Sequence, residues 1–269
     1  MYASRLGRFT TPDIVAGEMI NPQSLNRYLY VWNNPLRLTD PTGMVVEWED
    51  SKKKKKKGET KERTNTQREY ENHLEKMINS NDPDERAKGL KLQAEYKRLQ
   101  DSDIVFHVVN EAADSSSGEL GYKGQKGHLY VSLKGDSSAY GELTTIQKLA
   151  HEFKHGNQFL DGEFGFRKGT DGKWHGFAND LYDESEAMIT GFEAESINGF
   201  QKSDNQAYRA RNNAFFRELY AALPKGQSAV IDVMKNNGAS PYKNYSEKKI
   251  DIRSMPKSEG YYGIPKKTN

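Results

Sequence analysis

The feature that most constrains this chain is residues 143–160, where apolar residues recur at the helical period around two histidines. Such a pattern predicts a helix with one buried face. His151 and His155 are four residues apart, so on a helix their rings stand one turn above each other. Two imidazole nitrogens can then point at one metal ion, and a third ligand with a water would complete an open tetrahedral zinc site. The apolar residues of this stretch are Leu143, Ile146, Leu149, Ala150, Phe153 and Leu160.

A carboxylate accompanies the two histidines. Glu152 directly follows the first of them, so it projects near the metal and can accept a proton from a metal-bound water. The run His151-Glu152-Phe153-Lys154-His155 matches the H-E-x-x-H motif without a gap, and here the chain resembles the zinc-dependent peptidases. The resemblance implies Zn²⁺ as cofactor and Glu152 as general base. The plain alternative is a pair of solvated histidines at an incidental spacing.

Two histidines alone hold zinc poorly, so we expect a third protein ligand. Residues 178–197 predict a helix whose apolar face has glutamates on both borders. The gluzincin peptidases, which the chain resembles here, take a glutamate from a helix after the motif. In several toxin-type members this glutamate stands five residues before a glycine, and Glu186 and Gly191 have that spacing. Glu186 is therefore the predicted ligand, and the spacing leaves open Glu184, Glu193, Glu195 and His175.

A site made of three histidines is less well supported. The longer pattern H-E-x-x-H-x-x-G-x-x-H is absent, because Gln158 and Asp161 stand where it needs a glycine and a histidine. His175 lies further along the chain, directly after a predicted β-hairpin or flap over residues 162–174. Tyr182 is a candidate donor to a developing oxyanion, because tyrosines serve so in similar enzymes; core packing is its alternative role.

Composition excludes several other kinds of site and partner. The chain has no cysteine, so any metal must be held by His, Asp or Glu. The net charge of +2 depends on the run Lys52–Lys57, and the rest of the chain is acidic, which argues against nucleic acid as a partner. We see neither an apolar run long enough to span a membrane nor a signal peptide.

The first 43 residues carry a second set of motifs. Proline, glycine and asparagine punctuate short aromatic strands, expected at residues 27–32 and around Phe9. This segment closely resembles the C-terminal end of the RHS-repeat-associated core of bacterial polymorphic toxins. The matching residues are Arg5-Leu6-Gly7-Arg8-Phe9, Pro12-Asp13, Ser24-Leu25-Asn26-Arg27-Tyr28, Tyr30-Val31, Asn33-Asn34-Pro35 and Asp40-Pro41-Thr42-Gly43.

The resemblance implies that the chain is the end of a much larger β-shell protein that encloses a toxin. In that family the variable toxin begins just after the D-P-x-G motif, and some members cleave themselves there, usually after a leucine. Met44 stands in that place, so self-cleavage is not assumed. A cognate immunity protein, the rest of the shell and a protein substrate in a target cell are the implied partners, with export or delivery as part of a larger protein.

These observations predict an α+β protein in four parts. Residues 1–44 form the short β-rich RHS remnant, 45–64 a lysine-rich flexible linker, 65–235 the metallopeptidase domain and 236–269 a poorly ordered tail. The domain is expected to be zincin-like, with a small antiparallel sheet packed on the motif helix. Its predicted strands are residues 104–109, where His107 reads as a core or face residue, and 127–133. A strand just ahead of the motif helix resembles the arrangement of zincin-type peptidases, which implies that residues 127–133 border the cleft and pair with an extended substrate.

The predicted function is zinc-dependent peptide-bond hydrolysis by a toxin domain. Two alternatives stay open. One is a toxin of another activity, such as a nuclease; the other is a non-catalytic remnant that binds metal structurally or not at all.

Overall fold

The computed structural model describes residues 2–3, 8–9, 46–49, 64–109, 120–133, 144–194, 214–250, 252 and 261–263. The chain divides into two compact units, Met1–Met44 and Val45–Asn269. In the first unit, β1 (Tyr2–Ala3) pairs antiparallel with β2 (Arg8–Phe9), which confirms a strand at Phe9. The predicted strand at residues 27–32 and the lysine run of the expected linker lie outside the described residues.

The second unit contains both helices and sheets, as α+β predicts. Its main sheet has the strand order β3 (Val46–Glu49), β4 (Val105–Val109), β6 (His128–Ser132), β5 (Leu120–Gly121). The first three are parallel and only β5 is antiparallel, so the expected antiparallel sheet is wrong here. The two predicted strands, β4 and β6, are themselves parallel, and β3, in the segment predicted as a linker, adds a third parallel strand. Between β3 and β4 the chain forms α1 and α2, the long crossover that parallel neighbours need.

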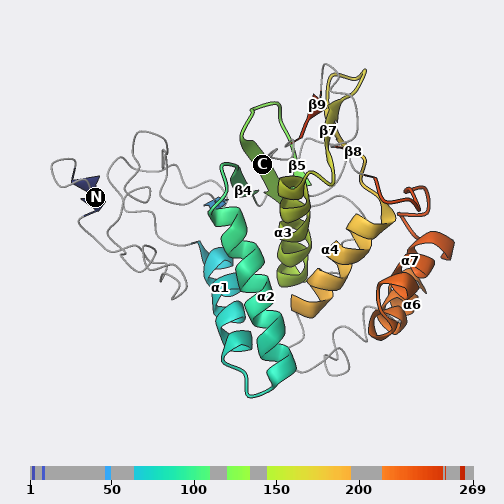
Figure 1. Cartoon of the computed structure of the whole chain (residues 1–269), viewed down its shortest axis with the longest axis horizontal. Helices are drawn as coiled ribbons and strands as arrows, with labels where there is room; N and C mark the ends of the chain where they lie inside the picture. Colours follow the sequence, from blue (N-terminus) through green and yellow to red (C-terminus); the bar gives the residue numbers. More distant parts are fainter. Residues whose placement is uncertain are drawn as a thin grey trace, which may run out of the picture. The chain divides into compact units, whose positions relative to one another are not determined.

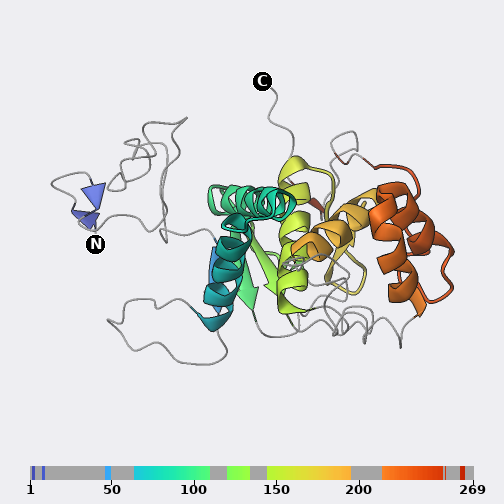
Figure 2. The ribbon, with the colours of Figure 1, turned by 90° about the horizontal axis from the view of Figure 1, so that it is seen from below.

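Helices α1, α2, α3 and α4 lie side by side in chain order (Figure 1). Helix α3 contacts α2 and α4, whereas α6 and α7 lie beside α4, away from α1 and α2 (Figure 2). Their bounds are α1 Asn65–Ile78, α2 Pro83–Gln100, α3 Thr145–Asp161, α4 Leu181–Ala194, α6 Ala214–Ala222 and α7 Gln227–Asn236, with a 3₁₀ turn at Leu223–Lys225. In the described part of the chain, no helix is long and apolar enough to cross a bilayer.

One face of the main sheet is apolar and packs against helices. Alternate strand residues point to opposite faces, and the buried side carries Val46, Trp48, Phe106, Val108, Leu129 and Val131. The Trp48 ring contacts Tyr70 of α1, Tyr96 of α2 and Phe153 of α3. Each such aromatic side chain buries about 150–250 Å². Strand β3 is therefore held to three helices at once and belongs to the domain.

Helix α3 has well-defined ends, which fix the position of its histidines. At its start, Thr144 Oγ1 accepts from the Gln147 backbone N–H and Gln147 Oε1 accepts from the Thr144 N–H, a reciprocal capping box. It ends at Gly162, whose φ of 71° is left-handed and suits glycine. The predicted helix at residues 143–160 is confirmed to within two residues at its start and one at its end.

A second sheet follows α3. The predicted hairpin is confirmed as β7 (Gly165–Lys168) paired antiparallel with β8 (Trp174–Phe177). Strand β9 (Tyr261–Tyr262) adds to the other side of β7. In the region predicted as a tail, residues 237–250 form hydrogen-bonded turns against α4 and α7.

Candidate metal centre

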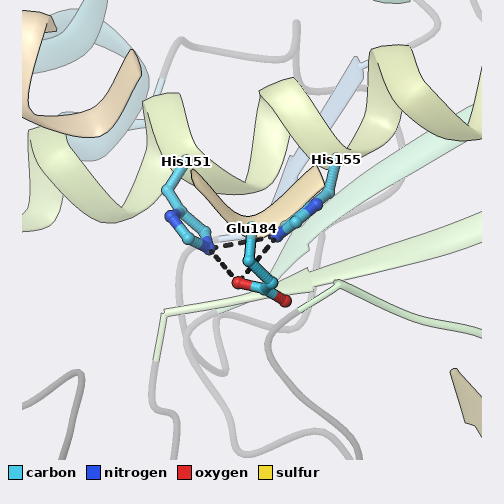
Figure 3. A group of neighbouring side chains, drawn as sticks. All are labelled: His151, His155 and Glu184. Carbon is cyan, nitrogen blue, oxygen red and sulfur yellow. Dashed lines mark hydrogen bonds and ion pairs between the residues drawn. The ribbon is translucent and has the colours of Figure 1, made fainter. Parts of the chain in front are cut away.

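The two motif histidines of α3 and one glutamate of α4 converge on a single position (Figure 3). His151 Nε2 and His155 Nε2 lie 3.1 Å apart. Glu184 Oε2 lies 3.8 Å from the first nitrogen and 3.6 Å from the second. Zinc ligands about 2.0–2.2 Å from a tetrahedral ion stand about 3.4 Å from one another. The observed separations bracket that value, so the three atoms are spaced as ligands of one small ion.

All three side chains of this group are buried. The exposed fractions of His151, His155 and Glu184 are 1%, 5% and 3%. Glu184 Oε2 accepts no hydrogen bond from the described residues, although it is fully shielded from solvent. A buried carboxylate oxygen beyond hydrogen-bond distance of any donor is costly, and the imidazoles at 3.6 Å and 3.8 Å offset this cost only in part. A metal ion between this oxygen and the two nitrogens would bind the oxygen directly.

His155 is oriented by an acceptor behind it. His155 Nδ1 lies 2.7 Å from Gln158 Oε1 and donates its proton to that oxygen, so Nε2 faces the group and would bind a metal after giving up its own proton. Gln158 is held in turn by donating from Nε2 to the Asp183 carbonyl, at 3.0 Å. The backbone of Ala187 on α4 lies near the His151 ring and favours the protonated form of that ring. Both imidazoles are thus presented by contacts with α4 or with α3 itself.

The group as a whole favours positive charge. Burial and the neighbouring His155 lower the pKa of His151 to about 3. Burial would also lower the pKa of His155, but the Glu184 carboxylate outweighs it and raises that pKa to about 9. Burial opposes ionisation of Glu184, yet His155 keeps the pKa of this carboxyl below its ordinary value. At neutral pH the group therefore consists of an ionised Glu184 carboxylate, a neutral His151 imidazole and a protonated, cationic His155.

Glu186, the first choice from the sequence, lies outside this group. Its carboxylate is 41% exposed and lies 3.4 Å from Lys154 Nζ, on the far side of Gln158. Glu184, one of the open alternatives, takes the position instead. The reason is how closely α4 approaches α3: a Cβ on Gly191 would lie 2.9 Å from the Gln147 carbonyl oxygen. That contact fixes which face of α4 meets the histidines.

The remaining alternatives to Glu186 lie elsewhere. His175 Nε2 lies 3.0 Å from both carboxylate oxygens of Asp171, within the β7–β8 hairpin. Glu193 forms a 2.8 Å ion pair with Lys91 on α2. The fourth alternative, Glu195, lies outside the described residues.

Glu152 lies beside the group without being part of it. Its side chain is 3% exposed and its Oε1 is 3.8 Å from His151 Nε2. It therefore stands within one water molecule of the position between the imidazoles. This is the position that the sequence predicted for a proton acceptor.

Several residues of the site gave no clear signal in the sequence. Asn179 donates from Nδ2 to Glu184 Oε1 at 2.6 Å and so fixes that carboxylate. The pKa of the Tyr245 hydroxyl is raised, first by the nearby charge of Glu184 and then by burial and the charge of Glu152. Tyr245 therefore lies close to both glutamates. Tyr182, the tyrosine favoured from the sequence, is 37% exposed. Only Gln158, three residues after His155 on one helix, could have been found from spacing.

The sequence's expectation for the strand before α3 needs correcting. Strand β6 has neighbours on both sides, β4 and β5, so it is not the edge of the sheet. The edge next to it is the short β5. Among the described residues, the edges to which an extended ligand could pair are those of β5 and, at the other end of the sheet, β3. Comparison with protein-family models, with curated proteins and with solved structures finds no match to this chain.

Proposed function

We propose that the second unit is a zinc-dependent peptide hydrolase of zincin-like fold. The observation that carries the proposal is the convergence of His151 Nε2, His155 Nε2 and Glu184 Oε2 within 4.8 Å of one another, with Glu152 next to them. Imidazole and carboxylate ligands are the set used by catalytic zinc sites, which keep a fourth position for water. A bound Zn²⁺ would supply Lewis acidity, lowering the pKa of that water and polarising the substrate carbonyl.

The remaining roles in the proposed hydrolysis would fall to side chains around the metal. Glu152 would take a proton from the attacking water and pass it to the leaving amine. Gln158 and Asn179 would hold His155 and Glu184 in place, as acceptors and donors behind metal ligands do. Tyr245 replaces Tyr182 as the candidate donor to the developing oxyanion, because its phenol lies near both glutamates and carries a proton at neutral pH.

One observation favours a second reading, a structural metal site. Exposed fractions of 1–5% for the four central side chains describe a closed group, and closed sites are typical of structural zinc. A peptide would reach this group only after part of the surrounding chain moves. Under this reading the metal would join α3 to α4, and Glu152 would have no proton to transfer.

The resemblance of residues 2–43 to the RHS core supports placing this hydrolase in a polymorphic toxin. The proposal then includes a protein substrate in a target cell, delivery as part of a larger exported protein, and a cognate immunity protein. A nuclease toxin is the rival of another class. It would cleave nucleic acid whether or not His151 is present.

The decisive experiment replaces Glu152 by Gln and measures cleavage of a peptide library together with zinc content. We expect cleavage to fall by about 10²–10⁴-fold, the usual contribution of a general base, while zinc content stays at one equivalent in this group. Glu186→Gln, a matched loss of one carboxylate outside the group, should keep full activity. Toxicity in cells without immunity should follow the same order.

Each other result has a distinct meaning. Unchanged cleavage in Glu152→Gln would remove the general-base role. Stoichiometric zinc without cleavage by the wild-type chain would support the structural site. An absence of bound zinc would end both readings.

A further inference from the structure

The main sheet has a second face, opposite α3, and it carries a row of polar side chains. The parallel register places Glu47 of β3 next to His107 of β4, and His107 next to Tyr130 of β6. His128 lies two residues before Tyr130, so it points to the same face. Three strands therefore bring a carboxylate and two imidazoles together, although the residues are far apart in the sequence.

The two imidazoles face each other closely. His107 Nε2 lies 2.8 Å from His128 Nδ1, and the ring planes are nearly parallel, 14° apart, with centroids 5.2 Å apart. Glu47 Oε2 lies 3.2 Å from the other nitrogen of the His107 ring. The Tyr130 ring stacks on His107, with centroids 4.8 Å apart. His107 is only 9% exposed, so its ring is held in this orientation from several sides.

The positions of the protons follow from these contacts. The Glu47 carboxylate, 3.2 Å from His107 Nδ1, favours a proton on that nitrogen, which leaves His107 Nε2 with its lone pair. At 2.8 Å the facing Nδ1 of His128 must either donate a proton to that lone pair or share a cation with it. Two bare lone pairs would repel each other at this distance. The two nitrogens therefore share one hydrogen-bonded proton, and a metal ion that displaces this proton would find two imidazole nitrogens beside it.

We propose that His107 and His128 are the protein ligands of a second site, for a divalent transition metal such as Zn²⁺ or Cu²⁺. Imidazole is a preferred ligand of both ions. Glu47 is the carboxylate behind a metal-binding histidine, which fixes its tautomer and raises its basicity. Opening the nitrogens from 2.8 Å to about 3.4 Å would accommodate the ion, a smaller change than a rotamer flip.

The geometry also sets the order of affinities. This pair offers two protein ligands, so water must complete the coordination, whereas the α3–α4 group offers three. Lys123 Nζ lies 4.5 Å from the centre of the Tyr130 ring, and its charge opposes a further cation nearby. The second site should therefore have the lower metal affinity of the two, and a chelator should remove its metal first.

The test is a titration of the full chain with ZnCl₂, followed by calorimetry and by NMR of the ring protons of its six histidines. We expect two equivalents of zinc, with the second weaker step shifting the signals of His107 and His128. His128→Gln should lose this step and keep the tighter one. His73→Gln, which removes a histidine bonded to the Ala194 carbonyl on another face, should keep both.

A second variant covers the case in which His128→Gln does not fold. Glu47→Gln keeps the shape of the side chain and removes its charge, so it should weaken the second step by about 10-fold or more. Circular dichroism checks that each variant is folded. Zinc binding that leaves the His107 and His128 signals of the wild-type chain unshifted, or a shift of the His107 signals that persists in His128→Gln, would overturn the proposal; a single step that shifts both rings would instead count against the α3–α4 group.

Discussion

Two histidine pairs in this molecule look alike locally but are built in opposite ways. In α3, His151 and His155 face each other at 3.1 Å because one helical turn separates them. Across β4 and β6, His107 and His128 face each other at 2.8 Å because two parallel strands are in register. The first pair is encoded by spacing alone. The second depends on long-range pairing, which no local pattern reveals.

The carboxylates of the two pairs also differ in place. Glu184 stands in front of both α3 imidazoles, 3.6 Å and 3.8 Å from their facing nitrogens, as a third ligand would. Glu47 stands behind one imidazole, 3.2 Å from its far nitrogen. A carboxylate in front adds a bond to a metal; one behind only orients and polarises a ligand. Removing each should therefore have effects of different size.

The largest effect should come from Glu184→Gln. Loss of the front carboxylate removes one of three ligands and the charge that stabilises a cation, so zinc affinity at the α3–α4 group should fall by more than about 100-fold. A chelator competition assay measures this. The α3 pair would then offer only two imidazoles, as the strand pair does, and the two affinities should become similar.

Glu186→Gln is the matched control, because it removes a carboxylate two residues away that contacts Lys154 instead. Its zinc affinity should equal that of the wild-type chain. If instead Glu186→Gln weakens zinc binding and Glu184→Gln does not, the assignment of the third ligand is wrong.

A smaller effect is expected from Gln158→Leu. Leucine has a similar volume but cannot accept the proton of His155 Nδ1, now 2.7 Å from the Gln158 oxygen. Zinc affinity should fall by about 10–100-fold, as for other groups that orient a metal-bound histidine. Gln158→Glu keeps an acceptor oxygen and should recover most of the loss. The same competition assay decides, and equal losses in both variants would show that Gln158 acts by packing alone.

Much of the fold could be predicted from local patterns. Thr144, Gln147 and Gly162 fix the ends of α3, and its apolar period fixes the buried face, so the helix and the facing of its histidines followed from spacing. The choice between Glu184 and Glu186 did not. Both lie at borders of the apolar face of α4, and the contact of Gly191 with α3 decides between them. Such a contact depends on how two helices pack, which the sequence of neither contains.

The strand register is the other part that sequence reasoning missed. Val46–Glu49 precedes a lysine run, so its composition suggested a linker, yet Trp48 and the pairing of Glu47 with His107 tie it to the core. Nothing in residues 46–49 specifies a partner strand almost sixty residues later. Parallel pairing is decided by the helices that connect the strands. The contact between His107 and His128 could therefore not be predicted without knowing which strands pair.

The smallest effect concerns Ala178, at the turn that leads into α4. Its φ of 67° is left-handed, which costs a residue with a Cβ about 1–2 kcal/mol. Ala178→Gly removes this strain but adds about 0.5–1 kcal/mol of chain entropy to lose on folding. The net result should be a stabilisation of up to about 1 kcal/mol, seen as a higher urea midpoint at unchanged slope.

Ala229→Gly, inside α7, should instead destabilise the protein by about 1 kcal/mol. Because Asn179 and Glu184 follow this turn, zinc affinity at the α3–α4 group should change slightly with Ala178→Gly, and affinity at the strand pair should not. A destabilisation equal to that of Ala229→Gly would mean that the turn at Ala178 stores no strain.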